Sequence, residues 1–600
     1  MVFTKKHELI KYLFIFFSIV CLTLSLTVSP RITGDGREYL GMVISITNHF
    51  TPNLTDEDLS ERESVERENH ITFPQGEDYA GYFKDLNDDY YSYHFWFYSL
   101  VCSIPYFFLD IFDLNPLKTF QLTNTLLLLL LIWWILYRTS FNYRTKLWLL
   151  ISVILSPVCF YISWSHPEVF SFVFLFIGLL EFLEKRFILA VILTSIASFQ
   201  NPGIAVVSAY IVLYQLFSVK RVTYSAICTM LSSLLVFIPY VFYWIHYHQF
   251  SLISSTGFAS LRLISLNKIL SLFFDLNFGL IIYVPVLLLT LIWLALKLDR
   301  VAISGLILLL LIAIICSTQA NWNSGMMYIN RYSVWMIPII IVSILRFIIS
   351  LDRRKFIKYV MIFTLTTGVV SFYCMYEQDY QNYLKFGPVT KLILSNFPSL
   401  YNPPYEVFVE RALGEEEEFK DKIPLTLWNI SGPRKTLMID SKTGQMKYIN
   451  DDLKINRNTD LFVMKKFEEG KDIFEQDEQG AFIRGWHSLE QDDKGNKFRW
   501  TDKEAQLLIH STQDHPTKIK MEISSFYSPR HCIIYLNDKV VFSGVIDVKS
   551  QSIEIKGNFV PGLNVLRIQS REGAQSPKSI PELKSSDARS LAFNIQHVLF

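Results

Sequence analysis

Residues 120–137 read FQLTNTLLLLLLIWWILY, eighteen residues without a charged side chain, and Arg138 follows directly. A helix of about 20 mostly apolar residues is long enough to cross a bilayer. Similar runs recur along the chain up to about residue 375, whereas Asp, Glu, Lys and Arg are dense after it. The sequence therefore predicts a polytopic α-helical membrane domain over 1–375 and soluble regions over 376–600.

The composition narrows the class of protein. The chain has 600 residues, of which 51% are hydrophobic and 15% aromatic, which is typical of a membrane protein. Its net charge of +1 provides no basic surface for nucleic acid, so we expect no nucleic-acid partner. The seven cysteines are scattered and form no CxxC pair or zinc spacing. These features argue against a nucleic-acid-binding protein, a disulfide scaffold and a zinc module.

The charged loops between the apolar runs indicate the orientation. Short loops rich in Lys and Arg stay on the cytoplasmic side of a membrane. In this chain the segments of that kind are the N-terminal stretch and residues 138–146, 185–186, 220–221, 297–300 and 353–358. Consecutive clusters must be separated by an even number of crossings, which predicts about eleven spans, a cytoplasmic N-terminus and an external C-terminal region. The predicted spans cover roughly residues 9–28, 120–137, 147–164, 167–184, 187–200, 204–218, 222–245, 277–296, 301–317, 335–351 and 356–375.

Two segments leave alternatives open. A crossing at 90–112 would place the basic residues 138–146 outside, so this aromatic segment is interpreted as a helix lying in the outer interface. A twelfth true span is the alternative. Residues 9–28 are interpreted as a retained first span, although a signal peptide has a similar pattern, because no clear small-residue cleavage site follows.

Three outer segments, 29–119, 246–276 and 318–334, hold the unusual polar residues. In the first of them, Asp35 stands between two glycines just beyond the first span. Small neighbours let a ligand approach closely, and a partly shielded Asp can act as a general base toward a hydroxyl. Arg37 is a neighbour that can adjust the pKa of this carboxyl. The alternative is a turn in which Asp35 only caps the next helix.

Further candidates lie elsewhere on the outer side. His166 and Glu168 occupy a turn between two spans, where ionisable groups tend to be functional. Arg331 enters a span from outside beside Tyr332, and it can grip a phosphate with a bidentate fork or extend its head group to the membrane surface. His94 begins the interfacial helix and either faces a ligand or caps and packs that helix.

Beyond residue 375 the pattern changes twice. Residues 376–478 mix turn signals with short β-like runs and are interpreted as an irregular α/β linking region. From 479 to 600, alternating runs separated by turns predict an antiparallel β-sandwich of jelly-roll type. The predicted strands cover residues 498–500, 505–509, 519–523, 532–536, 539–542, 553–555, 564–568 and 592–595.

Together these features resemble the GT-C integral-membrane glycosyltransferases, in particular the protein O-mannosyltransferase and aminoarabinose-transferase branch. The stretch GDGREYL at 34–40 resembles the acidic first-loop motif of that family, with glycine in place of the second acidic residue. YSYHF at 91–95 stands at the place of a second motif, without its Pro-Pro. DLNFGL at 275–280 with YVP at 283–285 resembles a later one, and Arg331-Tyr332 matches the end of a Gly-Pro-Arg-Tyr element.

The resemblance implies an inverting transferase that takes a sugar from a polyprenyl-phosphate donor on the outer face of a bacterial inner membrane. The acceptor would be a hydroxyl of a lipid, glycan or protein. Asp35 is implied as the catalytic base, Glu168 as a second catalytic carboxylate, and Arg331 as the cation for the phosphate. The other expected substrate-binding residues are Arg37, Glu38, His94, His166 and Tyr332. No dedicated metal site is predicted, and dependence on a divalent cation is left open.

Two other classes of protein remain as alternatives. A transporter or flippase of a lipid-linked saccharide would show repeated groups of spans, or charged residues near the middle of the bilayer. The sequence shows neither clearly, since its polar residues cluster at the outer ends of the spans. A non-catalytic membrane protein that binds glycans through its external sandwich is the third hypothesis, because the second acidic residue of the first motif is missing.

Overall fold

The computed structural model describes residues 2–32, 34–71, 79–218, 223–377, 382–416, 425–429, 432–439, 445–450, 462–463, 472, 482–492, 495–511, 515–560, 562–583, 585 and 587–599. The chain divides into two compact units, Met1–Tyr383 and Leu384–Phe600. The boundary between them lies a few residues beyond the predicted one at 375.

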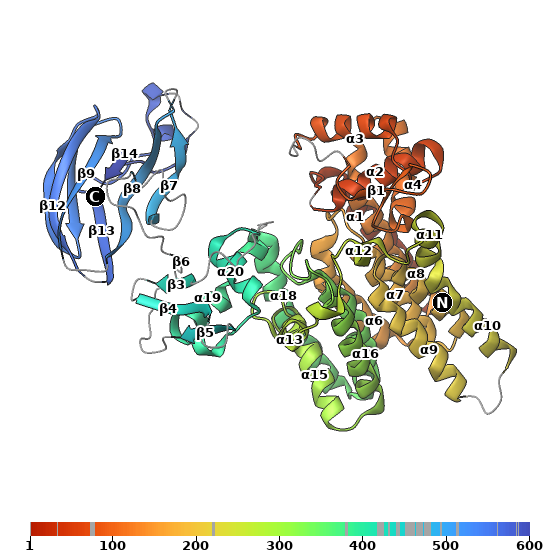
Figure 1. Ribbon diagram of the computed structural model, residues 1–600. Helices are drawn as coiled ribbons and strands as arrows, with labels where there is room; N and C mark the ends of the chain where they lie inside the picture. Colours follow the sequence, from red (N-terminus) through yellow and green to blue (C-terminus); the bar gives the residue numbers. More distant parts are fainter. Residues whose placement is uncertain are drawn as a thin grey trace. The chain divides into compact units, whose positions relative to one another are not determined.

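The first unit is almost entirely helical, as its long apolar runs predict (Figure 1). A short antiparallel hairpin of β1 (Tyr82–Lys84) and β2 (Tyr90–Ser92) lies between its third and fourth helices. The helices are α1 (Val2–Thr27), α2 (Gly36–His49), α3 (Asp56–Glu68), α4 (Phe97–Ile111), α5 (Thr119–Trp133), α6 (Tyr143–Ile154), α7 (Glu168–Leu183), α8 (Phe187–Gln200), α9 (Ala205–Ser218), α10 (Tyr224–Ser232), α11 (Ile238–Tyr247), α12 (Leu252–Ser255), α13 (Leu266–Phe274), α14 (Leu280–Tyr283), α15 (Pro285–Leu296), α16 (Arg300–Cys316), α17 (Arg331–Ser350) and α18 (Arg353–Glu377).

Within the described residues, four helical segments are long and apolar enough to cross a membrane: Pro116–Arg138, Tyr224–Tyr247, Arg331–Ser350 and Arg353–Met375. Helices α15 and α16 pass the same test only as a pair bent by 119°, which gives five spans if the pair counts as one. Four shorter apolar helices, one of them α4, have 10–17 residues. Helices lie in all of the predicted apolar runs, but α6 ends at Ile154 within the predicted span 147–164, and the predicted span 277–296 is divided between α14 and α15. Length and composition support four or five spans and not all eleven.

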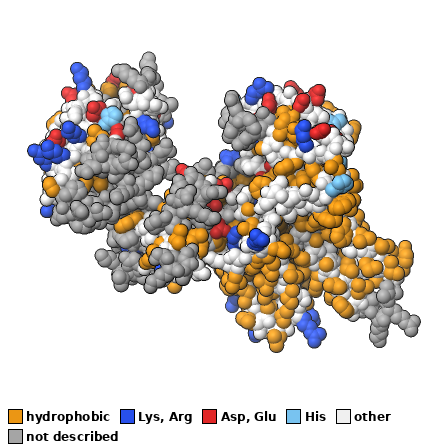
Figure 2. Space-filling view, in the orientation of Figure 1, with side chains coloured by type: hydrophobic (Ala, Val, Ile, Leu, Met, Phe, Trp, Pro, Cys, Tyr) orange, Lys and Arg blue, Asp and Glu red, His pale blue; other side chains and the backbone are white. Residues whose placement is uncertain are grey.

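The outside of these helices is apolar. Large hydrophobic side chains are exposed along α18, including Leu365, Val369 and Phe372, and also along α1, α10 and α11. Figure 2 shows hydrophobic side chains covering the helices of this unit, with charged side chains gathered around α3 and at the opposite tip. Continuous exposed apolar surface of this kind is what lipid covers, and helices satisfy their backbone groups within it.

Buried polar contacts hold α3 against α2. Asp58, in the first turn of α3, accepts hydrogen bonds from the backbone and the hydroxyl of Thr55, which completes a capping box. Its carboxylate also accepts a hydrogen bond from Ser45 of α2 and lies 2.8 Å from Nε2 of His49. Asp58 therefore fixes the position of α2, which begins directly after Asp35.

The β1–β2 hairpin is held between α2 and α11. The Tyr82 hydroxyl donates to the backbone carbonyl of Glu38, at 2.7 Å. On the other side, Nδ1 of His246 lies 2.8 Å from the buried carboxylate of Asp85. The Tyr243 hydroxyl donates to the carbonyl of Ser92 at 3.3 Å. The hairpin therefore places the residues that follow β2 beside the first turn of α2.

The second unit begins with a small helical and β-stranded region. It contains α19 (Pro388–Asn396) and α20 (Tyr405–Leu413). Its antiparallel sheet has the order β5-β4-β3-β6, and the strands are β3 (Leu425–Asn429), β4 (Gly432–Ile439), β5 (Met446–Asn450) and β6 (Phe462–Val463). The region interpreted from sequence as irregular thus includes an ordered four-stranded sheet, whose strands are too short to give a clear periodic pattern.

An eight-stranded antiparallel sheet lies where an antiparallel β-sandwich is predicted from residue 479 onward. The antiparallel strands are confirmed, but they form one sheet and not the two sheets of a jelly roll. The strand at 482–491 is not predicted, and the predicted segments 498–500 and 505–509 belong to a single strand. All eight predicted strand segments fall within or overlap its strands. Its main order is β11-β10-β13-β8-β14-β9-β12, and β7 pairs with β8. Buried residues from all of these strands except β7 form one hydrophobic core, so the sheet curves around it. The strands are β7 (Phe482–Gln491), β8 (Lys497–Ser511), β9 (His515–Ser525), β10 (Arg530–Leu536), β11 (Lys539–Ile546), β12 (Gln551–Phe559), β13 (Gly562–Ser570) and β14 (Phe593–Leu599).

Candidate functional site

Asp35 occupies the N-cap position of α2, but its side chain makes no capping hydrogen bond. The carboxylate instead faces two cationic side chains. Its Oδ2 atom lies 3.3 Å from Nε2 of His94 and 3.7 Å from Nη1 of Arg331. The side chain of Asp35 keeps 29% of its surface exposed, which leaves it open to a ligand. The interpretation of Asp35 as a simple helix cap therefore does not account for its surroundings.

The two glycines beside Asp35 are both required by the structure. Gly34 has φ of +49°, in the left-handed region that residues other than glycine rarely adopt. Gly36 touches the next segment so closely that an added Cβ would lie 1.9 Å from Oγ of Ser165. The Gly-Asp-Gly motif thus lets the first loop pass directly against the turn that carries His166 and Glu168.

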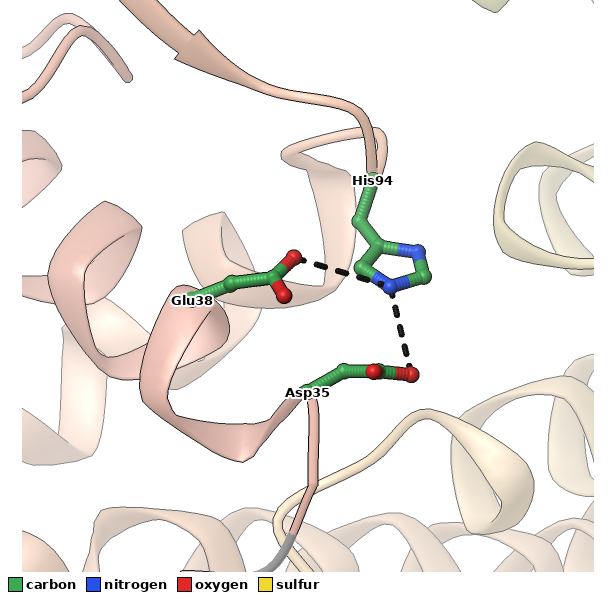
Figure 3. A group of neighbouring side chains, drawn as sticks. All are labelled: Asp35, Glu38 and His94. Carbon is green, nitrogen blue, oxygen red and sulfur yellow. Dashed lines mark ion pairs between the residues drawn. The ribbon is translucent and has the colours of Figure 1, made fainter. Parts of the chain in front are cut away.

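His94 connects Asp35 with a second carboxylate. Its Nε2 atom is also 3.6 Å from Oε2 of Glu38, so one ring nitrogen faces both acids (Figure 3). The imidazole is stacked on the ring of Tyr39, with centroids 5.1 Å apart. The Ser92 hydroxyl accepts a hydrogen bond from the His94 backbone and donates one to Glu38. These contacts fix the imidazole between the two carboxylates.

Arg331 and Glu168 complete the cluster from two distant helices. Arg331 is the first residue of α17, and one of its terminal nitrogens donates to the Tyr332 hydroxyl at 3.4 Å. Its Nε atom is buried and has no hydrogen-bond partner within the described part of the chain. Glu168 opens α7, is 2% exposed and interacts electrostatically with Arg331 and Asp35. Its Oε2 atom likewise lacks a hydrogen-bond partner among the described residues.

The charges around Asp35 set the ionisation of the cluster. Burial by itself would raise the pKa of Asp35, but contact with His94 and the surrounding positive charges hold that pKa well below its usual range. Burial would lower the pKa of His94, yet its contacts with the two carboxylates raise it. Burial raises the pKa of Glu38 to about 8. At neutral pH the cluster therefore holds an ionised Asp35 beside a neutral Glu38.

Most of the residues selected from sequence lie together. Asp35, Glu38, His94, Glu168 and Arg331 share one cluster. Tyr332 borders it through its contact with Arg331, and the ring of His166 lies 5.8 Å from that of Tyr39.

Arg37 lies elsewhere. It donates two hydrogen bonds to Glu66 of α3, at 2.9 and 3.1 Å, and this pair is buried. The structure gives Arg37 a place in the contact between α2 and α3, not beside Asp35.

Sequence reasoning overlooked several residues that shape the cluster. Gly81, with φ of +77°, precedes the hairpin, and an added Cβ there would lie 2.1 Å from the carboxyl carbon of Glu38. Tyr39 and Ser92 hold the imidazole of His94, and Tyr93 packs against the same ring at 4.3 Å. The available signal was the pair of polar residues Ser92 and His94 at the end of a β-like run, since Ser92 is the last residue of β2.

The cluster also contains a group of atoms suited to a metal ion. One ligand atom from each of Asp35, Glu38 and His94 lies within 4.8 Å of the other two. It is the only such group of three or more His, Cys, Asp or Glu side chains in the part of the chain that the structure describes. This group is not predicted from sequence, since these residues do not have the spacing of a known metal motif.

Comparison with known proteins adds little to this description. None of the family models compared with the chain matches it, and no curated protein matches it. Among solved structures, a family 35 carbohydrate-binding module from Cellvibrio japonicus is 14% identical and covers 20% of this chain and 86% of its own, with a TM-score of 0.15. An exo-β-1,3-galactanase from Phanerochaete chrysosporium is 12% identical and covers 27% and 36%, with a TM-score of 0.14. Likenesses this low carry no argument about fold or function.

Proposed function

We propose that the chain is a GT-C-type membrane glycosyltransferase that moves a sugar from a polyprenyl-phosphate donor to an acceptor hydroxyl on the outer face of the membrane. One observation carries the proposal. An ionised, partly open carboxylate at Asp35 lies 3.7 Å from the guanidinium of Arg331, which has an unpartnered buried donor. A base beside an anion-binding cation is what sugar transfer from a phosphate carrier requires.

The reaction then assigns a role to each group. The acceptor hydroxyl gives its proton to Asp35 while its oxygen forms a bond with the anomeric carbon. The bond from that carbon to the phosphate oxygen breaks, and its electron pair stays on the departing polyprenyl phosphate. Arg331 stabilises the negative charge that develops there. Direct displacement of this kind inverts the anomeric carbon.

Binding of the donor would also prepare the base. Contact with His94 and, to a smaller extent, the positive charge of Arg331 lower the pKa of Asp35 and make it a weak base. A phosphate bound to Arg331 offsets the Arg331 part of this effect and therefore raises the pKa of Asp35. Glu168, buried beside Arg331, is positioned to hold a hydroxyl of the donor sugar.

The apolar helices support the rest of the proposal. A lipid-linked donor reaches its enzyme within the bilayer, and helix ends at Glu168 and Arg331 place the cluster at one end of the apolar unit. The complete proposal has about eleven spans, of which the shorter apolar helices supply several, in a bacterial inner membrane. The cytoplasmic N-terminus and the external second unit follow from the distribution of Lys and Arg.

The test is sugar transfer by the purified full-length protein in proteoliposomes. A panel of radiolabelled polyprenyl-phosphate sugars is supplied with membrane lipids, glycans and proteins as acceptors. We expect transfer with at least one donor, and a loss of about 100-fold or more in Asp35→Asn. Asp88→Asn, an exposed residue of the same outer segment, is the matched control and should transfer normally. Absence of transfer with every donor, from folded protein, would favour transport or glycan binding.

A further inference from the structure

We propose that Asp35, Glu38 and His94 bind one divalent transition-metal ion, of the Zn²⁺ or Mn²⁺ class. One nitrogen and two carboxylate oxygens form a ligand set that such ions accept. The proposal concerns ion binding alone. It therefore does not depend on the transferase activity proposed above.

The separations of the ligand atoms fit this interpretation. The Nε2 atom of His94 lies 3.3 Å from Asp35 Oδ2 and 3.6 Å from Glu38 Oε2. Metal–ligand bonds of about 2.1 Å at tetrahedral angles place neighbouring ligand atoms about 3.4 Å apart. In Figure 3 both carboxylates point toward the same ring nitrogen from different directions, as ligands around a shared ion do.

The ring nitrogen of His94 that faces the two carboxylates is available to an ion. Although Nε2 of His94 is close to two carboxylates and is shielded from solvent, it forms no hydrogen bond with acceptable geometry to any described residue. A ring N–H directed at either oxygen would give such a bond. The nitrogen therefore lies near both oxygens without a hydrogen bond to either, which leaves it available to a third centre.

Glu168 provides a second, independent indication of a ligand. This carboxylate is 2% exposed, and its Oε2 atom has no hydrogen-bond partner within the described residues. A buried carboxylate oxygen without a partner is costly, so such atoms usually face an ion, a water or a substrate. Glu168 interacts electrostatically with both Asp35 and His94, which places it at the same cluster.

The surrounding contacts would hold the ligands in place. The Ser92 hydroxyl donates to Glu38, and the stacked ring of Tyr39 restricts rotation of His94. Such supporting contacts orient metal ligands and commonly change affinity about 10- to 100-fold. Three protein ligands leave at least one position open in a four-coordinate ion, where a hydroxyl or phosphate oxygen could bind.

The test measures binding of the ion itself. The purified full-length protein is stripped with a chelator, mixed with Zn²⁺ or Mn²⁺ in separate experiments, freed of excess ion by gel filtration and analysed by elemental mass spectrometry. We expect about one ion per chain for at least one of the two metals. Loading with Co²⁺ should give a visible absorption band of histidine and carboxylate coordination.

Variants assign the site. His94→Ala and Glu38→Gln should each weaken binding by at least about tenfold and remove or shift the Co²⁺ band. His70→Gln, which changes an exposed histidine of the same outer segment, should bind as the wild type does. Thermal unfolding and gel filtration identify any variant that fails to fold. If one of the two ligand variants does not fold, the other one decides whether the ion binds at this site. Less than a tenth of an ion per wild-type chain with either metal, or unchanged binding by a folded ligand variant, would overturn the proposal.

Discussion

Gly36 has no room for a side chain, because a Cβ there would lie 1.9 Å from Oγ and 2.8 Å from Cβ of Ser165. We therefore expect Gly36→Ala to displace the first loop, to cost about 1–3 kcal/mol of stability and to reduce sugar transfer at least tenfold. Thermal unfolding and the transfer assay measure the two effects. Removing the opposing side chain in the double variant Gly36→Ala/Ser165→Gly should restore much of both. If the double variant is neither more stable nor more active than Gly36→Ala, contact with Ser165 is not the cause of the loss.

The positive charge of Arg331 can be tested separately. Gln at this position keeps a polar side chain but removes the positive charge, so we expect Arg331→Gln to reduce transfer about 100-fold or more. Neutral Gln also removes a positive charge near Asp35, which raises the pKa of that carboxyl. Because the remaining activity needs ionised Asp35, it should be lost at a higher pH than in the wild type. Arg262→Gln, an exposed residue of another outer segment, is the control. Equal transfer by Arg331→Gln and the wild type would remove Arg331 from the proposed reaction.

The ionisable residues of the cluster are predictable from sequence one by one, but their arrangement is not. Ionisable residues at the outer ends of apolar runs are rare and expensive to bury, which is why Asp35, Glu168 and Arg331 could be selected individually. Their approach to one another depends on the packing of helices far apart in the chain. Arg37 was expected to act on Asp35 because it is a sequence neighbour, but the first turn of α2 directs it to Glu66.

Among the elements, α3 makes a pH-dependent contact with α2 through Asp58. Although burial opposes the effect, hydrogen bonds from His49 and Thr55 hold the pKa of Asp58 below its usual value. Its unfolded value is about 3.9, so the contact stabilises the segment above about pH 4 and is lost as pH falls through the lower folded pKa.

Hydrogen exchange of α3 between pH 6 and pH 3 should reveal this loss. We expect protection of α3 to decrease in the wild type as Asp58 is protonated. Asp58→Asn should be less protected already at pH 6 and should respond less to acid. Glu57→Gln, an exposed neighbour, should behave as the wild type does. Identical acid profiles for Asp58→Asn and the wild type would contradict the role given to this carboxylate.

The β1–β2 hairpin depends on the pair formed by Asp85 and His246, which joins it to α11. We expect His246→Ala to loosen the hairpin, to speed hydrogen exchange across 82–92 about tenfold and to lower transfer by misplacing His94. His248→Gln changes an exposed histidine two residues away and should leave exchange unchanged. Unaltered exchange in His246→Ala would show that other contacts position the hairpin.

The elements themselves were predictable to different degrees. The β-domain strands alternate buried and exposed residues, most clearly in β10, and were therefore recognised from sequence. Strands β3 to β6 have two to eight residues and lie among turn signals, so the sequence indicates short β-like runs there but not a sheet. Apolar runs predict helices reliably. Breaks within these runs, such as the 119° bend between α15 and α16, depend on packing, so composition alone does not determine the number of spans.

For the whole molecule, the proposed topology predicts which surfaces face outward. Glu57 of α3 and Lys297 after α15 are both exposed and are assigned to opposite sides of the membrane. In intact cells, a maleimide that cannot cross the membrane should label Glu57→Cys directly but label Lys297→Cys only after permeabilisation. The opposite pattern would invert the topology, and labelling of both from outside would contradict it.

The position of the donor phosphate decides whether Asp35 and Arg331 share one reaction centre. Electron cryomicroscopy of the full-length protein in nanodiscs with polyprenyl phosphate would locate it. We expect phosphate density in contact with the guanidinium of Arg331, with Asp35 across an opening large enough for an acceptor hydroxyl. Phosphate bound at another place, while Arg331 remains paired with Asp35, would contradict a shared reaction centre.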